Sequence, residues 1–300
     1  MPLSFDIQGH RGARGLFPEN TLQGFAAARD LGVHIFELDV GLTRDGVVVV
    51  SHDPALNPDI THDAAGRWLA EPGPLIRDLT LAELGQYDVG RIRPGTRYAG
   101  LFPDQVAIDG ARIPTLLDVL RMDDRTRFNI EVKTDPTHPD HTAAAVTLAN
   151  AVLAVIDQAD AARRVMIESF DWRGPRHIRA VRPEIPTAWL TSQTTEAASG
   201  LWWDGPTLAD HGGSVPRAVA AAGGTMWAPQ YLTLTRARLS DAQGLGLIVL
   251  PWTVNQPSDI RRLIQWGVDG LITDRPDLAL RILAQAATER GSVRSDGWNQ

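Results

Sequence analysis

Short apolar runs recur along the chain, and three of them lie near the N-terminus, at residues 5–9, 36–40 and 47–51. Runs of this length are typical of strands that are buried in a protein core. Each is bordered by residues suited to chemistry, which are His10 with Arg11, Glu37 with Asp39, and His52 with Asp53. The pattern therefore predicts buried strands with polar side chains at their ends.

The second and third runs are too close together to form a parallel pair. A short loop at residues 42–46 separates them, whereas a parallel crossover needs a dozen residues or more. We therefore expect an antiparallel hairpin closed by Asp45-Gly46. Strand alternation turns Glu37 and Asp39 to the same side, where His52 can face them.

Strand and helix patterns alternate over most of the chain. Parallel strands are predicted around Ile7, Leu38, Ile130, Ile167, Ala188, Met226, Ile248 and Leu271, with the strand that leads to His52 as an extra. Eight such strands with helices between them indicate an α/β fold, a (β/α)8 TIM-type barrel. A doubly wound sheet is the alternative.

One long segment interrupts this alternation. Residues 54–113 are rich in Pro, Gly and Asp and are too long for an ordinary barrel loop. We interpret them as an insertion after the second strand region, folded over one face of the barrel. Residues 1–288 are predicted to form a single domain, and residues 289–300 a disordered tail.

Composition excludes several classes of protein. The net charge is −7 and no block of positive charge stands out, which argues against nucleic acid as a partner. There are no cysteines, so thiolate metal sites and disulfides are excluded. Because no apolar stretch approaches 18 residues, we expect a cytoplasmic protein without membrane insertion. Its oligomeric state stays open.

Polar residues at the carboxyl ends of barrel strands point to one rim and can be collected into a candidate site. The residues collected in this way are His10, Arg11, Glu37, Asp39, His52, Glu131, Lys133, Glu168, Trp252 and Asn255. Lys133 is the only lysine beside 28 arginines, which suggests a position where a compact ammonium is wanted.

These residue types indicate phosphate chemistry with a divalent metal. Three carboxylates, on Glu37, Asp39 and Glu131, are hard oxygen ligands of the kind that Mg²⁺ and Ca²⁺ prefer. Arg11 and Lys133 offer positive charge to a phosphate, and the histidines His10 and His52 supply acid and base near neutral pH.

The chain resembles the glycerophosphodiester phosphodiesterase family. The motifs that carry the resemblance are His10-Arg11-Gly12, Pro18-Glu19-Asn20-Thr21, Glu37-Leu38-Asp39-Val40, Thr43-Arg44-Asp45-Gly46, His52-Asp53, Glu131-Val132-Lys133 and Trp252-Thr253-Val254-Asn255. They occur in order and at spacings like those of the family, from residue 5 to about residue 280.

The resemblance implies a barrel enzyme that splits a small-molecule glycerophosphodiester into glycerol 3-phosphate and an alcohol. By resemblance, the acid and base are His10 and His52, the ligands of one Mg²⁺ or Ca²⁺ are Glu37, Asp39 and Glu131, and the phosphate contacts are Arg11 and Lys133. The signature also favours Trp252 as a wall of the substrate site.

Several alternatives stay open at this stage. The nucleophile is water or the glycerol 2-hydroxyl, and either histidine can be the acid. Glu168 is a supporting residue of the site or part of a rim ion pair. A lysophospholipase D acting on single-chain lipids would need an apolar groove, with Trp202 and Trp203 as candidates for its lining. A barrel that has lost catalysis and only binds is the third possibility.

Overall fold

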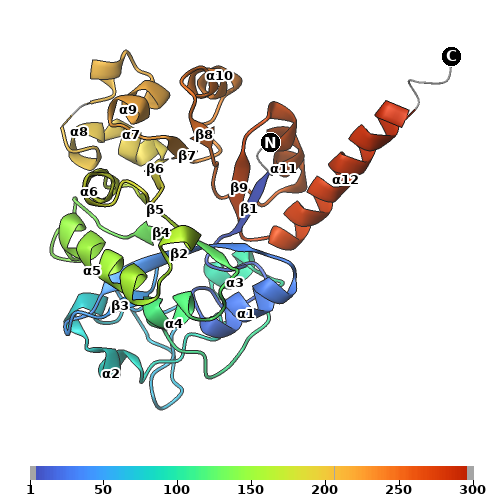
Figure 1. The fold of residues 1–300 in the computed structure, drawn as a ribbon. Coiled ribbons are helices and arrows are strands. Elements are labelled where there is room, and N and C mark those ends of the chain that lie inside the picture. Colours follow the sequence, from blue (N-terminus) through green and yellow to red (C-terminus); the bar gives the residue numbers. More distant parts are fainter. Residues whose placement is uncertain (1–4, 206, 296–300) are drawn as a thin grey trace.

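The computed structural model describes residues 5–205 and 207–295 and shows a nearly closed parallel barrel (Figure 1). The barrel strands, in chain order, are β1 (Asp6–Gly9), β2 (Ile35–Leu42), β4 (Arg127–Val132), β5 (Val165–Ser169), β6 (Thr187–Thr191), β7 (Met226–Pro229), β8 (Ile248–Val249) and β9 (Gly270–Thr273). Backbone hydrogen bonds from Asp269 to Val249 (3.1 Å) and from Ile272 to Pro251 (3.0 Å) join the two ends of the sheet. The predicted TIM-type barrel is confirmed.

Helices lie between the strands on the outside of the barrel (Figure 1). They are α1 (Leu22–Asp30), α4 (Leu116–Leu120), α5 (Ala145–Gln158), α6 (Arg173–Val181), α9 (Val215–Ala221), α10 (Arg236–Gly244), α11 (Pro257–Trp266) and α12 (Pro276–Ser295). Thr21 begins α1 by accepting a hydrogen bond from the Gly24 amide at 3.0 Å.

Packing of apolar side chains holds the helices to the barrel. The buried face of α5 carries Leu148, Val152 and Ile156 at four-residue spacing, which places them on one side of the helix. Phe36 of β2 packs between the rings of Phe25 and Phe128, with ring centroids 5.3 and 6.3 Å apart. Burial of each such side chain stabilises the fold by about 1.5–3 kcal/mol.

The predicted hairpin is present. Strand β3 (Val48–Val50) pairs antiparallel with β2, with Val40 opposite Val50. Gly46 in the turn has φ of +79°, a left-handed conformation that glycine adopts without steric cost. Because of the hairpin, the chain returns to the rim immediately after β2, and His52 lies there.

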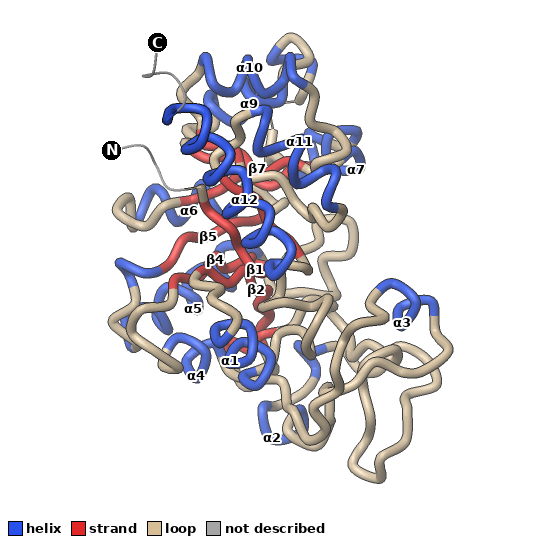
Figure 2. The backbone as a smooth tube through the Cα atoms, turned by 90° about the vertical axis from the view of Figure 1, so that its right-hand side faces the viewer, coloured by secondary structure: helices blue, strands red, loops and turns tan. Residues whose placement is uncertain are grey.

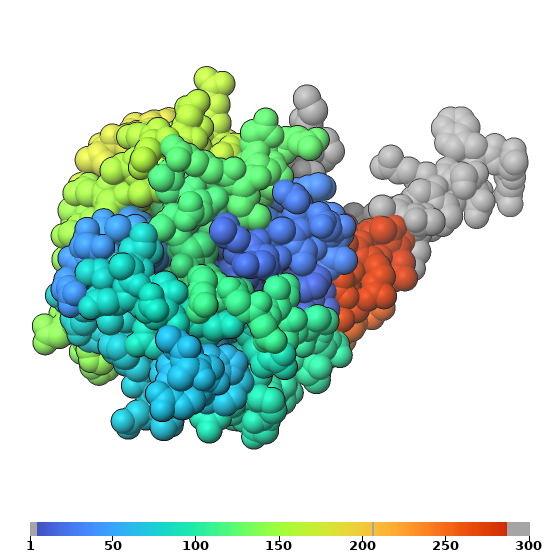
Figure 3. Space-filling model, turned by 90° about the horizontal axis from the view of Figure 1, so that it is seen from below, coloured from blue at the N-terminus to red at the C-terminus, as the bar shows by residue number. Residues whose placement is uncertain are grey.

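The segment 54–113 packs beside the barrel and contains a 3-10 turn, η1 (Ile76–Asp78), and two short helices, α2 (Leu81–Leu84) and α3 (Arg97–Leu101). Figure 2 shows it as a largely irregular lobe on one side, and in Figure 3 its cyan and blue-green atoms cover much of the lower face. The Arg77 guanidinium donates hydrogen bonds to the backbone carbonyls of Asp140 (3.0 Å) and Thr142 (2.8 Å). These hydrogen bonds hold the segment against the loop after β4.

Two further regions contain helices, residues 191–213 and the C-terminal segment. The stretch 191–213, which has no regular pattern, contains the short helices α7 (Gln193–Ala197) and α8 (Ser199–Trp202), and Ser192 caps the first of them. The tail expected from residue 289 is helical as far as Ser295, because α12 continues through its Ala, Glu and Arg residues, which favour helix. Figure 1 shows this helix projecting away from the barrel. Residues 296–300 lie outside the described part.

Candidate active site

Acidic side chains of three neighbouring strands lie at the same level of the barrel. Strand register places Asp39 of β2 opposite Glu131 of β4, and Glu131 opposite Glu168 of β5. Glu37 lies two residues before Asp39 and therefore points to the same side of β2. All four carboxylates are buried. The parallel sheet thus collects negative charge at one place inside the rim.

Three of these carboxylates form a cluster that can hold a metal ion. Ligand oxygens of Glu37, Glu131 and Glu168 lie within 4.8 Å of one another. Burial and mutual repulsion raise the pKa of Glu131 to about 7 and that of Glu168 to about 8, and the pKa of Glu37 well above its usual value. A divalent cation bound by these oxygen ligands would offset the repulsion among the carboxylates.

Asp39 lies outside this cluster, against positively charged side chains. Its carboxylate is 3.4 Å from the Arg11 guanidinium and 3.6 Å from the Lys133 ammonium, and it accepts a hydrogen bond of 3.0 Å from Asn20. Burial would raise the pKa of Asp39, but the neighbouring charges, chiefly those of His52 and Arg11, hold it well below its usual range. Of the three predicted metal ligands, the structure thus brings Glu37 and Glu131 together with Glu168.

The two predicted phosphate contacts, Arg11 and Lys133, both line a cavity at the rim of the barrel. Arg11 pairs with Glu19 at 2.6 Å and has a left-handed backbone with φ of 51°. Its amide donates to Glu37 at 2.9 Å, so the strained turn after β1 is tied to the acidic cluster. The Lys133 ammonium lies 2.9 Å from Glu131.

His10 follows β1 and is held by a carboxylate from the other end of the chain. Its Nδ1 lies 2.6 Å from Asp274, which follows β9, the strand beside β1. Asp274 also accepts hydrogen bonds from Arg14 (2.9 Å) and Asn255 (2.6 Å). The His10 Nε2 atom lies 3.8 Å from Glu37, so the free side of the ring faces the acidic cluster.

His52 follows β3 and has a carboxylate partner next to it in the sequence. Its Nδ1 lies 2.7 Å from Asp53, which in turn accepts a hydrogen bond of 2.7 Å from Asn57. Burial alone would raise the pKa of Asp53, but the hydrogen bond with His52 contributes to lowering it to about 2. Asp53 therefore stays ionised and fixes the orientation of the His52 ring.

Both histidines have a lowered pKa. Burial and the charges of Arg11 and Lys133 lower the pKa of His52 to about 4. Burial also lowers the pKa of His10, although the negative charge of Asp274 opposes this shift. A bound phosphate brings negative charge near both rings and raises their pKa again.

A cavity of about 270 Å³ joins these groups. Both histidines, the three clustered carboxylates and Lys133 line it, together with Phe170 and Trp252. The ring of Trp252 meets that of Phe170 edge to face at 5.3 Å, and its Nε1 donates to the Ala228 carbonyl at 2.9 Å. The predicted wall residue Trp252 is therefore held in place at the cavity, which we call the central cavity.

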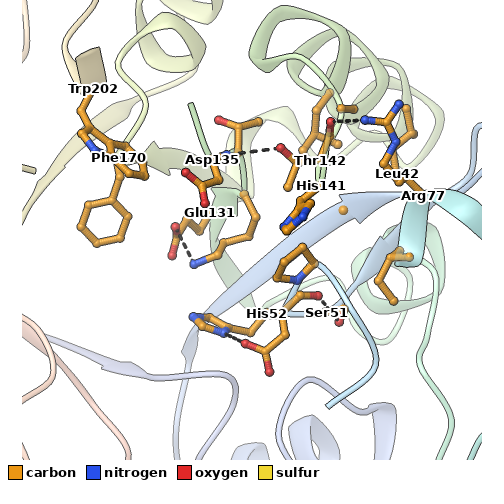
Figure 4. Close-up of a pocket in the computed structure, with 18 residues that line it drawn as sticks. Leu42, Ser51, His52, Arg77, Glu131, Asp135, His141, Thr142, Phe170 and Trp202 are labelled. Carbon is orange, nitrogen blue, oxygen red and sulfur yellow. Dashed lines mark hydrogen bonds and ion pairs between the residues drawn. The ribbon is translucent and has the colours of Figure 1, made fainter. Parts of the chain in front are cut away.

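A second cavity of about 240 Å³ adjoins the central cavity beside His52 (Figure 4). Its lining includes Trp202, the first of the two tryptophans considered for an apolar groove. Trp203 is fully buried instead and stacks on Trp172, with ring centroids 4.3 Å apart. Trp203 is therefore a core residue.

Sequence reasoning missed two residues of the site, Asp274 and Arg14. Asp274 stands at the end of the last strand, so the rule that collected the other rim residues would also have found it. Arg14 lines the central cavity and lies over the ring of Phe102, 4.5 Å from its centroid. It belongs to an irregular loop, and nothing in its sequence context marks it.

The described helices include none that is long and apolar enough to cross a membrane.

The Bacillus subtilis (strain 168) glycerophosphodiester phosphodiesterase is 27% identical over 90% of this chain and 83% of its own length. A solved structure from Silicibacter pomeroyi DSS-3, provisionally named a glycerophosphoryl diester phosphodiesterase, is 39% identical with a TM-score of 0.85, and the match covers 96% of this chain and 95% of that one.

A phosphodiesterase of Oleispira antarctica, solved with the product sn-glycerol-3-phosphate, shares the fold, with a TM-score of 0.69 at 23% identity and coverage of 93% and 96%. The model of the glycerophosphoryl diester phosphodiesterase family matches residues 10–278. The resemblance drawn from the sequence motifs is confirmed: the chain belongs to the glycerophosphoryl diester phosphodiesterase family and is an enzyme of that family.

Proposed function

We propose that the protein hydrolyses glycerophosphodiesters to glycerol 3-phosphate and an alcohol, with a divalent metal ion and with His10 and His52 as the acid and base pair. One observation carries the proposal: the two histidines, each oriented by a carboxylate, face the same cavity as three clustered carboxylates. The cavity also receives positive charge from Arg11, Arg14 and Lys133.

The metal ion fits the residues present. Glu37, Glu131 and Glu168 would hold Mg²⁺ or Ca²⁺, and Asp39 offers an additional oxygen, because its Oδ1 accepts no hydrogen bond from the described residues. When bound, the ion neutralises charge on the phosphoryl oxygens and on the carboxylates themselves. The high pKa values of Glu131 and Glu168 favour this, since they show how poorly the protein alone stabilises the ionised cluster.

The histidines divide the proton transfers between them. One of them, neutral, accepts the proton of the nucleophile, which is water or the glycerol 2-hydroxyl, and the other, protonated, donates to the leaving oxygen. Asp274 and Asp53 accept a hydrogen bond from the Nδ1–H group of their histidines, so that each ring presents Nε2 to the cavity. Each carboxylate also stabilises the imidazolium form of its histidine.

Positive side chains hold the phosphate between the histidines. Arg11 and Arg14 are each fixed by carboxylates, so their guanidinium groups are oriented before the substrate binds. Lys133 lies between the central cavity and the second cavity and brings a compact positive charge. Positive charge fixed in advance stabilises the transition state without further rearrangement.

Phosphorus NMR tests the proposal directly. We expect glycerophosphocholine and glycerophosphoglycerol to yield glycerol 3-phosphate with Mg²⁺ or Ca²⁺ but not in EDTA, and a transient cyclic phosphate signal would identify the 2-hydroxyl as the nucleophile. The variants His10→Ala and Glu37→Ala should lose the reaction. If both diesters stay intact with every metal while lysophosphatidylcholine is cleaved, the single-chain lipid is the substrate and the proposal is wrong.

A further inference from the structure

The cavity beside His52 shares part of its wall with the central cavity and is otherwise lined differently. We propose that it binds the alcohol end of the diester, and that it selects large apolar alcohol groups over small ones. This inference rests on the proposed function and names the substrate class of the same site. We call this cavity the alcohol chamber.

Continuity with the phosphate site is the first argument. His52, Glu131, Lys133 and Phe170 line both cavities. A phosphate held by Lys133 next to His52 therefore has one ester oxygen directed to each cavity. Each half of the diester occupies a cavity of its own, of about 270 Å³ and 240 Å³.

The linings decide which half goes where. Carboxylates, histidines and arginines surround the central cavity, and these groups pair with the hydroxyls of glycerol. The alcohol chamber is mostly apolar, with walls formed by Leu42, Pro54, Ile76, Ala143, Phe170 and Trp202. In such a site each buried methylene group strengthens binding about 4-fold.

Aromatic rings form one side of the chamber. Figure 4 shows Arg77 on one side, and Phe170 and Trp202 on the other. The Lys133 ammonium, which also lines the central cavity, is 5.9 Å from the centre of the Phe170 ring.

Three carboxylates also line the chamber, and each has a partner within the protein. Glu131 lies 2.9 Å from Lys133, and Asp53 lies 2.7 Å from His52. Asp135 accepts a hydrogen bond from the Thr137 amide (2.8 Å) and lies 3.0 Å from His138. An apolar group that enters the chamber leaves these interactions in place.

Three segments outside the barrel strands contribute to the chamber. The insertion contributes Pro54, Ile76 and Arg77, the loop after β4 contributes Asp135, His141, Thr142 and Ala143, and α8 contributes Trp202. The hydrogen bonds of Arg77 hold the first two segments together. The chamber therefore depends on loops outside the catalytic motifs, and its chemistry can vary while those motifs stay the same.

The test compares three esters of sn-glycerol 3-phosphate, made with methanol, choline and 3,3-dimethylbutanol, the last being the neutral isostere of choline. The measurement is kcat/KM for release of glycerol 3-phosphate by the full-length protein with Mg²⁺ or Ca²⁺. We expect the dimethylbutyl ester to exceed the methyl ester by about 10-fold or more. The choline ester has the same shape as the dimethylbutyl ester, so this pair separates the effect of charge from that of size. Equal values for the methyl and dimethylbutyl esters overturn the proposal.

Two neighbouring variants locate the effect. Ala143→Phe fills the chamber, and Ala144→Phe adds the same ring at an exposed position outside it. We expect the first to lower kcat/KM about 10-fold for the dimethylbutyl ester and less than about 3-fold for the methyl ester, and the second to change neither. Equal losses on both esters in Ala143→Phe contradict the proposal. If no ester is cleaved by the wild-type protein, the proposed function fails as well, so the two failures are distinguishable.

Discussion

His10 and His52 have the same chemistry but are positioned by different means. Each has a carboxylate on Nδ1, at 2.6 Å for His10 and 2.7 Å for His52. The partner of His10 is 264 residues away and reaches it only because β9 lies beside β1, whereas the partner of His52 is the next residue. The His10 side chain is 12% exposed and the His52 side chain 32%. One half of the acid and base pair thus depends on barrel closure and the other on a local turn.

The largest expected effect comes from removing either ring, which tests whether the two histidines are equally needed. His10→Ala and His52→Ala should each lower kcat by about 100- to 10,000-fold, the range for a general acid or base. Circular dichroism and thermal melting provide the control for folding. If one variant keeps nearly full activity, the pair is not the acid and base pair that we propose.

Removing the carboxylate partner of each histidine should lower kcat/KM to different degrees on the His10 side and the His52 side. We expect Asp274→Asn to lower kcat/KM about 100-fold and Asp53→Asn about 10-fold, within the range seen for carboxylates that orient histidines. The reason is that Asp274 is buried and also holds Arg14 and Asn255, while the Asp53 side chain is 36% exposed. A larger loss in Asp53→Asn than in Asp274→Asn would reverse the comparison.

The acidic cluster that His10 faces predicts how stability depends on pH. In the metal-free protein Glu131 and Glu168 have a pKa of about 7 and about 8, above the value of 4.5 for the unfolded chain. Between pH 6.5 and 8 the folded state therefore holds protons that the unfolded state has lost, and stability falls as the pH rises. The histidines oppose this fall only at the lower end of the window, because their pKa values are lowered in the folded protein and the unfolded chain releases their protons around pH 6.5.

Thermal melting in EDTA measures this fall, and added Mg²⁺ or Ca²⁺ should remove it, because the ion stabilises the ionised cluster. The double variant Glu131→Gln with Glu168→Gln is the matched control and should melt at a nearly constant temperature over the same window. A melting temperature that is flat in wild-type protein in EDTA would show that the cluster ionises without cost.

The same contrast explains what the sequence reveals. The hairpin, the eight parallel strands and the motif around His52 follow from local spacing, so they are predictable. Asp274 becomes a partner of His10 only through closure of the barrel, which spacing along the chain does not show. Glu168 lies with Glu37 and Glu131 in the carboxylate cluster, while Asp39 lies against Arg11 and Lys133, and only side-chain geometry shows this arrangement.

The smallest effect tests how far the insertion supports the His10 side. Tyr98 of α3 donates a hydrogen bond to Glu19, and Glu19 pairs with Arg11 at 2.6 Å. Tyr98→Phe keeps the ring but removes this hydrogen bond, so we expect kcat/KM to fall about 3-fold, mainly through KM, because Arg11 then holds the phosphate less firmly. Phe102→Leu, in the same segment, is the control for general loosening of the insertion. If it reproduces the kinetic change of Tyr98→Phe, packing of the insertion is responsible and the hydrogen bond to Glu19 is not.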